Sequence, residues 1–244
     1  MSAIVLKKIT KYFEEDGKKL AVLENINLEI ENGEFFVLVG PSGSGKSTLL
    51  RIMSGLEKKY TGEVIFDKNI SHHDISFVFQ QFALLPWLTV FENVELGLLS
   101  KKIDEKNRHS MVMRELSQFG LEKFAHSYPR DLSGGMRQRV GIARALATDP
   151  KIIFMDEPFS ELDSFTAEEL RKELLQIWSK RRPTIIMVTH IIAEALELAD
   201  RVAVLTPRPA KIERIIKNTL SRPRAMRSND FFHLEDQLYQ LIRP

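Results

Sequence analysis

Short runs of apolar residues recur along the chain, separated by turn signals or by helical patterns. In four of these runs the apolar residues are consecutive, which is typical of strands buried on both faces, as in a parallel sheet. We therefore expect buried strands within residues 34–40, 151–158, 184–190 and 201–207. Two earlier segments, AIVLKKITKYF and AVLENINLEI, alternate more regularly and predict antiparallel strands at an edge.

The middle of the chain, from about residue 87 to residue 148, carries no convincing strand pattern. Thr89 and Glu92 have the spacing of a capping box, in which two side chains satisfy backbone N–H groups at a helix start. Apolar residues at helical spacing follow, and Thr166 with Glu169 predicts a second helix start in the same way. The pattern predicts an α/β fold with a mainly parallel sheet, an N-terminal antiparallel β subdomain and an inserted α-helical subdomain.

These elements predict four parts of the chain. Residues 1–86 would form the first part of the core with the antiparallel β subdomain, and residues 87–148 the helical subdomain. Residues 149–210 would complete the core, and residues 211–244 would form a C-terminal helical appendage.

Composition narrows the class of protein. The chain has 244 residues, of which 43% are hydrophobic, so it can bury a sizeable core. A net charge of +2 argues against a dedicated nucleic-acid binder, and the absence of cysteine excludes disulfides and thiolate metal sites. No window approaches the roughly 18–20 apolar residues of a membrane helix, and the first residues lack the apolar run of a signal peptide. We therefore expect a cytosolic protein that meets a membrane only through a partner.

The segment GPSGSGKST, residues 40–48, matches the phosphate-loop pattern G-x-x-x-x-G-K-[ST] and lies between a predicted strand and a predicted helix. Its glycines allow a tight turn whose successive N–H groups face a phosphate, and the following helix aims its positive end there. Lys46 would reach the β- and γ-phosphates, and the Ser47 hydroxyl would ligate Mg²⁺. The strand and helix on either side favour this interpretation over a glycine-rich turn with a chance lysine. The motif thus makes the core a P-loop NTPase.

Polar residues follow two other predicted strands. Asp156 and Glu157 end one of them, and His190 ends another. Ligands of open α/β sheets bind beyond the carboxyl ends of the strands, which is also where the phosphate loop lies. Asp156 would hold Mg²⁺ through its water shell, Glu157 would polarise the attacking water, and His190 would contact the γ-phosphate or that water. Each residue alone is more commonly structural, and the phosphate loop favours the functional interpretation.

A second glycine motif occurs in DLSGGMRQRVGIARALA, residues 131–147. Ser133, Gly134 and Gly135 precede a helical pattern, so small residues and free backbone donors again stand at a helix start and form a second possible anion site. A glycine-rich helix start with a basic, solvated face is the alternative, and the motif alone does not decide between them.

The segments GPSGSGKST, LSGGMRQR, IIFMDEP, SELD and TH, in this order, resemble the nucleotide-binding subunit of an ATP-binding cassette (ABC) transporter over about residues 4 to 210. In that family two subunits pair head to tail, so the resemblance implies a homodimer in which Ser133–Gly135 of one subunit caps the ATP of the other. It also implies that Tyr12 stacks on adenine, with Val22 a weaker candidate, and that Gln80 approaches Mg²⁺ and water. His190 would be the switch histidine, and Ser160 to Asp163 would join the two active sites.

The predicted site residues fall into groups by role. The catalytic candidates are Glu157, His190 and Gln80, and the Mg²⁺ candidates are Ser47, Gln80 and Asp156. The candidates that bind ATP from the partner subunit are Ser133, Gly134, Gly135 and Asp163. The candidates that bind ATP within the subunit are Tyr12, Gly40, Pro41, Ser42, Gly43, Ser44, Gly45, Lys46, Ser47, Thr48 and Asp156.

The stretch FVFQQFALLPWLTVFENV, residues 77–94, delivers Gln80 at the end of a strand and then crosses irregularly to the helical region, where Pro86 forbids a continuous helix. Aromatic surface at such a crossing suits a socket for a partner helix. We therefore predict that Phe82, Leu85 and Trp87 dock a transmembrane permease. The alternative is that the aromatic residues only pack the helical region.

A narrower resemblance, to importers of nitrate, taurine and aliphatic sulfonates, rests on FALLPWLTVFENVELGL and ADRVAVLTPRPAKI. It implies import of a small solute, an indirect partnership with a solute-binding protein, and a bacterial or archaeal subunit held by its permease at the cytoplasmic face of the plasma membrane. The chain departs from that branch at Gln81 and Phe82, where glutamate and proline are common, and at Ile191, where aspartate is usual.

Three other functions are alternatives to this one. A transporter ATPase for another substrate or direction fits the same motifs. A soluble cassette ATPase acting on nucleic acid or ribosomes usually has fused cassettes or long insertions, and this chain has neither. A P-loop kinase or GTPase leaves the LSGG segment unexplained, and the chain has no N-K-x-D guanine-reading motif.

Overall fold

The computed structural model describes residues 1–15 and 17–242. The chain divides into two compact units. The flanking unit comprises Met1–Ile70 and Pro183–Pro244, and the middle unit comprises Ser71–Arg182. Among the described residues, no helix is both long and apolar enough to cross a membrane.

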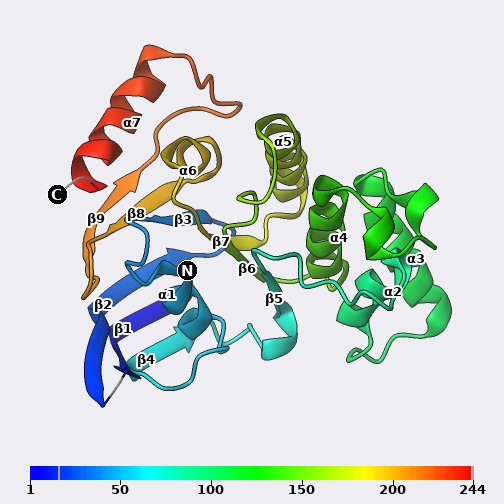
Figure 1. Ribbon diagram of the computed structural model, residues 1–244, viewed down its shortest axis with the longest axis horizontal. Helices are drawn as coiled ribbons and strands as arrows, with labels where there is room; N and C mark the ends of the chain where they lie inside the picture. The colour runs from blue at the N-terminus through cyan, green and yellow to red at the C-terminus, as the bar shows by residue number, and fades with distance from the viewer. Residues whose placement is uncertain (16, 243–244) are drawn as a thin grey trace. The chain divides into compact units, whose positions relative to one another are not determined.

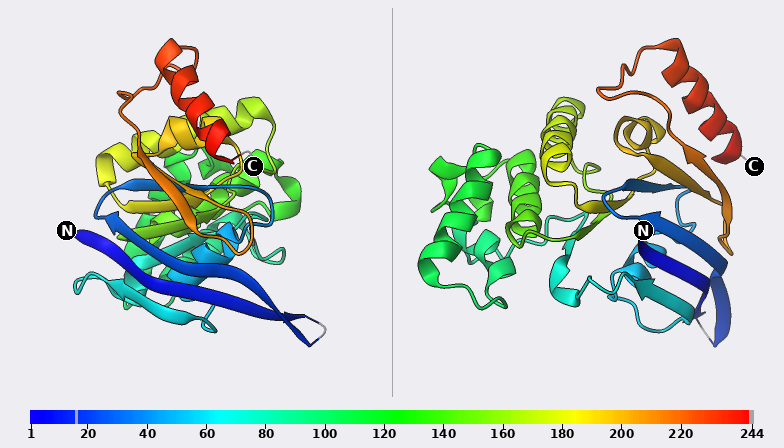
Figure 2. Two further views of the ribbon diagram at one scale, coloured as in Figure 1. Left: turned by 90° about the vertical axis from the view of Figure 1, so that its left-hand side faces the viewer. Right: turned by 180° about the vertical axis from the view of Figure 1, so that it is seen from behind.

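The N-terminal part of the flanking unit is a three-stranded antiparallel sheet with the order β2-β1-β4. Its strands are β1 (Ser2–Glu15), β2 (Lys18–Glu31) and β4 (Thr61–Phe66). Figure 2 shows β1 and β2 running side by side. In the register Leu6 lies opposite Leu28, and both are buried, because alternate residues of each strand face the core. The predicted antiparallel strands are confirmed.

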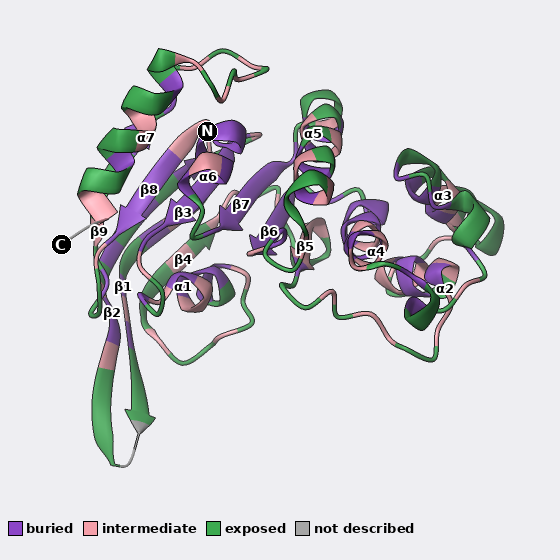
Figure 3. Cartoon of the chain, turned by 45° about the horizontal axis from the view of Figure 1, so that its top comes forward, coloured by how far each residue is buried: buried purple, intermediate pink, exposed green. Residues whose placement is uncertain are grey.

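The same unit contains a second sheet, in which β3 (Phe35–Val39) lies between and parallel to β7 (Thr184–Val188) and β8 (Arg201–Leu205). Every residue of β3 and β7 is buried, as the consecutive apolar runs predict (Figure 3). An edge strand, β9 (Ile212–Lys217), pairs antiparallel with β8. This strand was not predicted, because only Ile216 of its six residues is buried and its sequence lacks a clear alternation.

Three helices belong to the flanking unit: α1 (Lys46–Met53), α6 (Ile192–Leu198) and α7 (Asn229–Ile242). In α7, Phe231 and Leu238 are buried, and the helix packs against α6 and β8 (Figure 1). Within residues 211–244, for which the sequence predicts a helical appendage, the structure has the strand β9, an irregular connection and then α7.

The middle unit combines a strand pair with a group of helices. Strand β5 (Ile75–Val78) runs parallel to β6 (Ile152–Asp156), and the predicted parallel arrangement is confirmed for this pair. The helices are α2 (Val90–Glu95), α3 (Glu105–Gln118), α4 (Gly134–Ala147) and α5 (Ser164–Arg181), with short 3₁₀ turns at residues 72–74, 96–98, 122–124 and 129–131.

Two helix starts test the capping predictions. At α2, Thr89 Oγ1 accepts from the backbone N–H of Glu92 while Glu92 accepts from the N–H of Thr89, so the predicted capping box is confirmed. At α5 the prediction is wrong: the helix begins at Ser164 and its cap is Asp163, three residues before Thr166, because the Asp163 carboxylate accepts from the N–H groups of Phe165 and Thr166. An aspartate N-cap satisfies the same free donors as a capping box and moved the helix start toward the N-terminus.

Candidate functional site

The phosphate loop lies between β3 and α1, as the sequence predicts. Lys46, the first residue of α1, is buried, and its ammonium donates to the carbonyls of Gly40 at 2.9 Å and Pro41 at 2.8 Å. Its positive charge is therefore held over the loop, at the helix end where the backbone dipoles already favour an anion.

Two glycines of the loop are required by close packing. A Cβ atom on Gly40 would lie 2.8 Å from the carbonyl oxygen of Leu205, and one on Gly45 would lie 2.8 Å from Val22 Cγ1. Gly45 also has φ 102°, a backbone conformation that favours glycine. The Ser44 hydroxyl inside the loop is buried and has no hydrogen-bond partner among the described residues. An unpaired buried donor beside a lysine and a helix start fits a phosphate ligand.

Arg208 is a further contact of the phosphate loop that the sequence analysis missed. It lies in the connection between β8 and β9, and its Nε donates to the carbonyl of Gly43. Arg208 therefore restrains the exposed side of the phosphate loop, although it lies more than 160 residues further along the chain. Nothing in the phosphate-loop pattern could have found this residue, because the β8–β9 connection alone brings it there.

Two aromatic side chains at the end of β1 are candidates for stacking on a base. Tyr12 is 51% exposed and Phe13 is 40% exposed, and as neighbours in a strand they point to opposite faces. Phe13 lies opposite Leu20 on β2, and the Lys11 ammonium lies over its ring at 4.3 Å. The structure thus presents Phe13 as a second exposed aromatic candidate beside the predicted Tyr12, and its place next to Tyr12 in the sequence is the signal that could have found it.

His190 follows β7, which is parallel and adjacent to β3, so His190 and the phosphate loop lie at the same edge of this sheet, as predicted. The side chain of His190 is exposed. Ile191 cannot cap α6 with its side chain, and the helix has no side-chain cap, but the neighbouring Thr189 holds the turn that precedes it. Thr189 Oγ1 accepts from the N–H of Ile191 at 3.1 Å and bonds the Glu194 carboxylate at 2.8 Å.

In the middle unit, Asp156 and Glu157 stand at the end of β6. Asp156 is buried, whereas Glu157 is half-buried and has a positive φ of 44°. That conformation is strained for a residue with a side chain, and such strain is concentrated at functional sites. The carbonyl of Glu157 accepts from the backbone N–H of Ser160 at 3.3 Å and its hydroxyl at 3.0 Å, which holds the turn after the strand.

The second glycine motif forms the start of α4. Ser133 caps the helix by accepting from the N–H of Met136 at 3.2 Å. A Cβ atom on Gly135 would lie 2.4 Å from Thr166 Cγ2, so packing within the unit requires this glycine. A Cβ atom on Gly134 would meet nothing closer than the carbonyl of Glu161 at 3.9 Å. Packing within the described chain therefore does not explain why residue 134 is glycine.

The start of α5 lies beside the start of α4, because Gly135 of α4 packs against Thr166 of α5. Asp163 caps α5, and the hydrogen bonds from Thr166 hold the pKa of the Asp163 carboxyl below its usual range. The carboxyl is therefore charged at neutral pH. The structure thus brings together two groups predicted to contact ATP of a partner subunit, Ser133–Gly135 and Asp163.

Two arginines of helix α4 also contact the segment that follows Gln80. The Arg144 guanidinium donates to the carbonyls of Phe82 at 3.1 Å and Ala83 at 2.7 Å, and burial lowers the pKa of Arg144. Arg137 lies over the Phe82 ring at 5.3 Å and donates to the Leu132 carbonyl at 2.8 Å. These contacts connect the start of α4 to the irregular segment beyond β5.

The predicted docking residues lie in that irregular segment. Trp87 is 69% exposed, whereas Phe82 and Leu85 are half-buried. Gln80 is exposed at the start of the segment. Asn93 of α2 fixes the far end, since its amide donates to the carbonyls of Leu85 and Leu88 and its Oδ1 accepts from the N–H of Leu85.

Comparison with known proteins gives a consistent result. Residues 23–160 match the family model described as ABC transporter. The chain is 43% identical to the aliphatic sulfonates import ATP-binding protein of Bacillus subtilis, over 94% of this chain and 90% of the relative. It is 42% identical to the nitrate import ATP-binding protein of Synechocystis, over 93% of this chain and 91% of the relative. A dimeric post-hydrolysis structure of the ATP-binding cassette MJ0796, bound to ADP and Pi, matches with TM-score 0.78 and 38% identity, covering 88% of this chain and 98% of that one.

Proposed function

The chain belongs to the ABC transporter family as an ATPase subunit that couples ATP hydrolysis to transport, and we propose on this premise that it drives the import of a small sulfonate-like or nitrate-like anion. The observation that carries the proposal is the identity of 42–43% to import proteins for these solutes over more than nine-tenths of this chain. The solute itself would be recognised by a permease and a solute-binding protein.

Within the subunit, the phosphate loop and Lys46 would hold the phosphates of ATP, with Tyr12 or Phe13 stacking on the adenine. Ser47, Gln80 and Asp156 offer a hydroxyl, an amide and a carboxylate oxygen, a set of hard donors that fits Mg²⁺. When bound, Mg²⁺ would neutralise charge on the β- and γ-phosphates. Glu157 would then polarise the attacking water, and His190 would orient it against the γ-phosphate.

Two subunits would pair head to tail, so that Ser133–Gly135 and Asp163 of each complete the nucleotide site of the other. The absence of a packing reason for Gly134 within its own chain supports this proposal. The relative that binds ADP and Pi is itself dimeric. Because ATP would be shared between the subunits, binding would close the dimer and hydrolysis would reopen it.

The permease would dock at the segment that contains Phe82, Leu85 and Trp87. The large exposed surface of Trp87 supports this role. A cavity of about 390 Å³ begins two residues further along the chain, and its lining combines the carboxylates Glu92, Glu95 and Glu105 with Arg108, which already pairs with Glu95 at 2.6 Å. The charge of this lining is mixed, so the docking proposal rests on the exposed apolar surface of Trp87.

A growth experiment tests the proposed function. A strain that lacks this subunit would be complemented with the wild-type chain or with Glu157→Gln, on an alkanesulfonate as sole sulfur source and on nitrate as sole nitrogen source. We expect the wild-type chain alone to restore growth on one of the two. Purified Glu157→Gln should bind ATP, hydrolyse almost none and form an ATP-dependent dimer. Undiminished hydrolysis by Glu157→Gln would refute the role of Glu157, and unimpaired growth of the strain on both media would refute the substrate class.

A further inference from the structure

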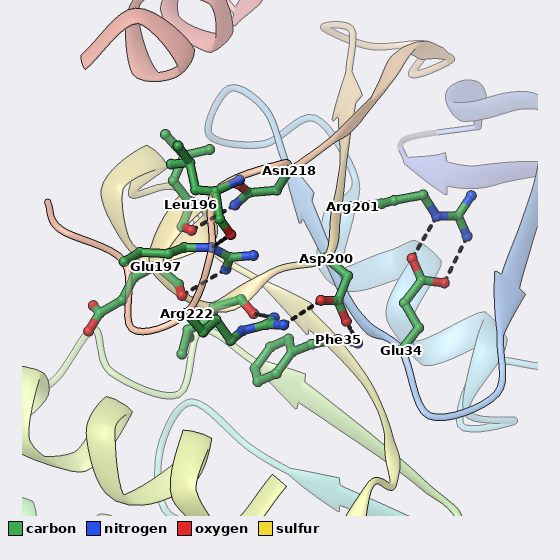
Figure 4. A network of polar contacts seen from close by, with 11 residues as sticks. Glu34, Phe35, Leu196, Glu197, Asp200, Arg201, Asn218 and Arg222 are labelled. Carbon is green, nitrogen blue, oxygen red and sulfur yellow. Dashed lines mark hydrogen bonds and ion pairs between the residues drawn. The ribbon is translucent and has the colours of Figure 1, made fainter. Parts of the chain in front are cut away.

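The segment between β9 and α7 crosses the C-terminal end of α6. We name residues 218–228 the strap (Figure 4). Three consecutive carbonyls of α6 accept hydrogen bonds from it. Asn218 donates to Leu196 at 2.8 Å, Arg224 donates to Glu197 at 2.8 Å, and Arg222 donates to Leu198.

These carbonyls need outside partners because the last four carbonyls of a helix have none within it. Helix α6 has seven residues, no basic residue in its last turn, and an extended C-cap at Ala199 in place of a glycine. A helix this short is unstable alone, and its negative end favours nearby cations. The two arginines of the strap supply that charge.

The strap is itself fastened to the sheet. Arg222 donates to Oδ1 of Asp200, whose Oδ2 accepts from the N–H of Phe35 at the start of β3 (Figure 4). The backbone N–H of Asn218 donates to the carbonyl of Asp200 at 2.8 Å. Asp200 therefore connects the strap to the strand that leads to the phosphate loop, and α6 is held between the strap and the sheet.

His190 and Thr189 lie at the other end of α6. His190 lies two residues before the first residue of α6, and Thr189 is bonded to Glu194 in the first turn. A helix of seven residues is only about 10 Å long. A shift at its C-terminal end would therefore move the segment that carries His190, because the helix transmits the shift as a rigid body.

We infer that Asn218, Arg222 and Arg224 of the strap are positioning residues for His190, which they align at the nucleotide by fixing α6. This inference rests on the role of His190 in the proposed function. It assigns a role in hydrolysis to a segment outside the matched ABC transporter region, residues 23–160. The strap itself would not contact the nucleotide.

The test compares Arg224→Met, which keeps most of the apolar stem, with Arg227→Met, a change at an exposed strap residue. We expect Arg224→Met to lower kcat for ATP hydrolysis about tenfold, less than the roughly hundredfold that a 1 Å misplacement can cost. The Kd for ATP should stay within about twofold, since the phosphate loop is unchanged. Arg227→Met should behave like the wild type. Asn218→Ala is the milder second variant if Arg224→Met folds poorly, and it should lower kcat in the same direction.

A spectroscopic readout separates positioning from general destabilisation. In protein with ¹³C-labelled histidine, the His190 signal is the one that disappears in His190→Ala. Arg224→Met and Asn218→Ala should shift or broaden it and leave the signals of the four histidines in residues 71–182 unchanged. An unchanged His190 signal, or a kcat equal to that of the wild type, would overturn the inference. Full hydrolysis by His190→Ala would instead refute the role of His190 in the proposed function. The His190 signal of the strap variants would still show whether the strap positions this residue.

Discussion

The two glycines at the start of α4 allow packing within the chain to be separated from contact with a partner subunit. Gly135→Ala places a methyl carbon 2.4 Å from Thr166 Cγ2, well inside van der Waals contact. Overpacking of this kind costs about 1–3 kcal/mol. For a chain of this size, about 1 kcal/mol lowers the melting temperature by roughly 2–4 °C, so we expect a decrease of roughly 2–12 °C. Thr166→Ser removes the clashing carbon, and the double variant should recover most of the loss.

Gly134→Ala should leave the fold intact. The added methyl group would meet only the Glu161 carbonyl, at 3.9 Å, and alanine is the better helix former by up to about 1 kcal/mol. If the N–H groups at Gly134 approach the γ-phosphate bound by a partner subunit, the methyl group would intrude on that contact. We therefore expect an unchanged melting temperature together with at least tenfold weaker ATP-dependent dimerisation, equivalent to about 1.4 kcal/mol or more.

The assay combines thermal unfolding with size-exclusion chromatography in ATP, the latter on the Glu157→Gln background. The decisive comparison is between variants: Gly135→Ala with Thr166→Ser should regain stability, whereas Gly134→Ala should lose dimer formation without losing stability. A Gly134→Ala protein that dimerises and hydrolyses ATP like the wild type would refute the reasoning. A large fall in its melting temperature would refute it as well, because the structure offers no clash to cause one.

Two further predictions concern the segment after Gln80. Arg144→Ala removes two hydrogen bonds from a guanidinium, each worth about 1.5–3 kcal/mol. We therefore expect amide hydrogen exchange of residues 82–88 to accelerate at least about tenfold relative to α5, and equal rates would contradict the proposed grip of α4 on this segment. Trp87→Ala should leave the ATPase activity of the isolated subunit within about twofold and weaken pull-down of the permease, since Trp87 is exposed. Phe124→Ala, another exposed aromatic residue, is the matched control, and unchanged recovery of permease by Trp87→Ala would remove the docking role.

Much of the fold could be predicted from the sequence because its signals are local. The consecutive apolar runs marked β3, β6, β7 and β8, and the capping box marked α2. The prediction was wrong at the start of α5, where Asp163 caps three residues before Thr166. Strand β9 was missed because an exposed edge strand needs little hydrophobic alternation.

The site shows the same division between local and long-range signals. The phosphate loop and the start of α4 are contiguous motifs, so the sequence displays them. Arg208 and Arg144 bind backbone carbonyls of segments more than 60 residues away, and a carbonyl has no sequence identity that a pattern could recognise. The contacts of the strap could not be predicted from the sequence, because its partners are again main-chain carbonyls.

The anchoring of the phosphate loop has a thermodynamic consequence. Gly45 packs against Val22 of β2, Gly40 packs against Leu205 of β8, and Arg208 holds the carbonyl of Gly43. A loop restrained from three directions has little conformational entropy left to lose, whereas ordering a free residue costs about 1–2 kcal/mol. Little of the free energy gained from contacts with the phosphates is then spent on ordering the loop, and most of it is available to drive another process. In the proposed dimer, where two subunits would share each ATP, that free energy would favour the association of the two subunits.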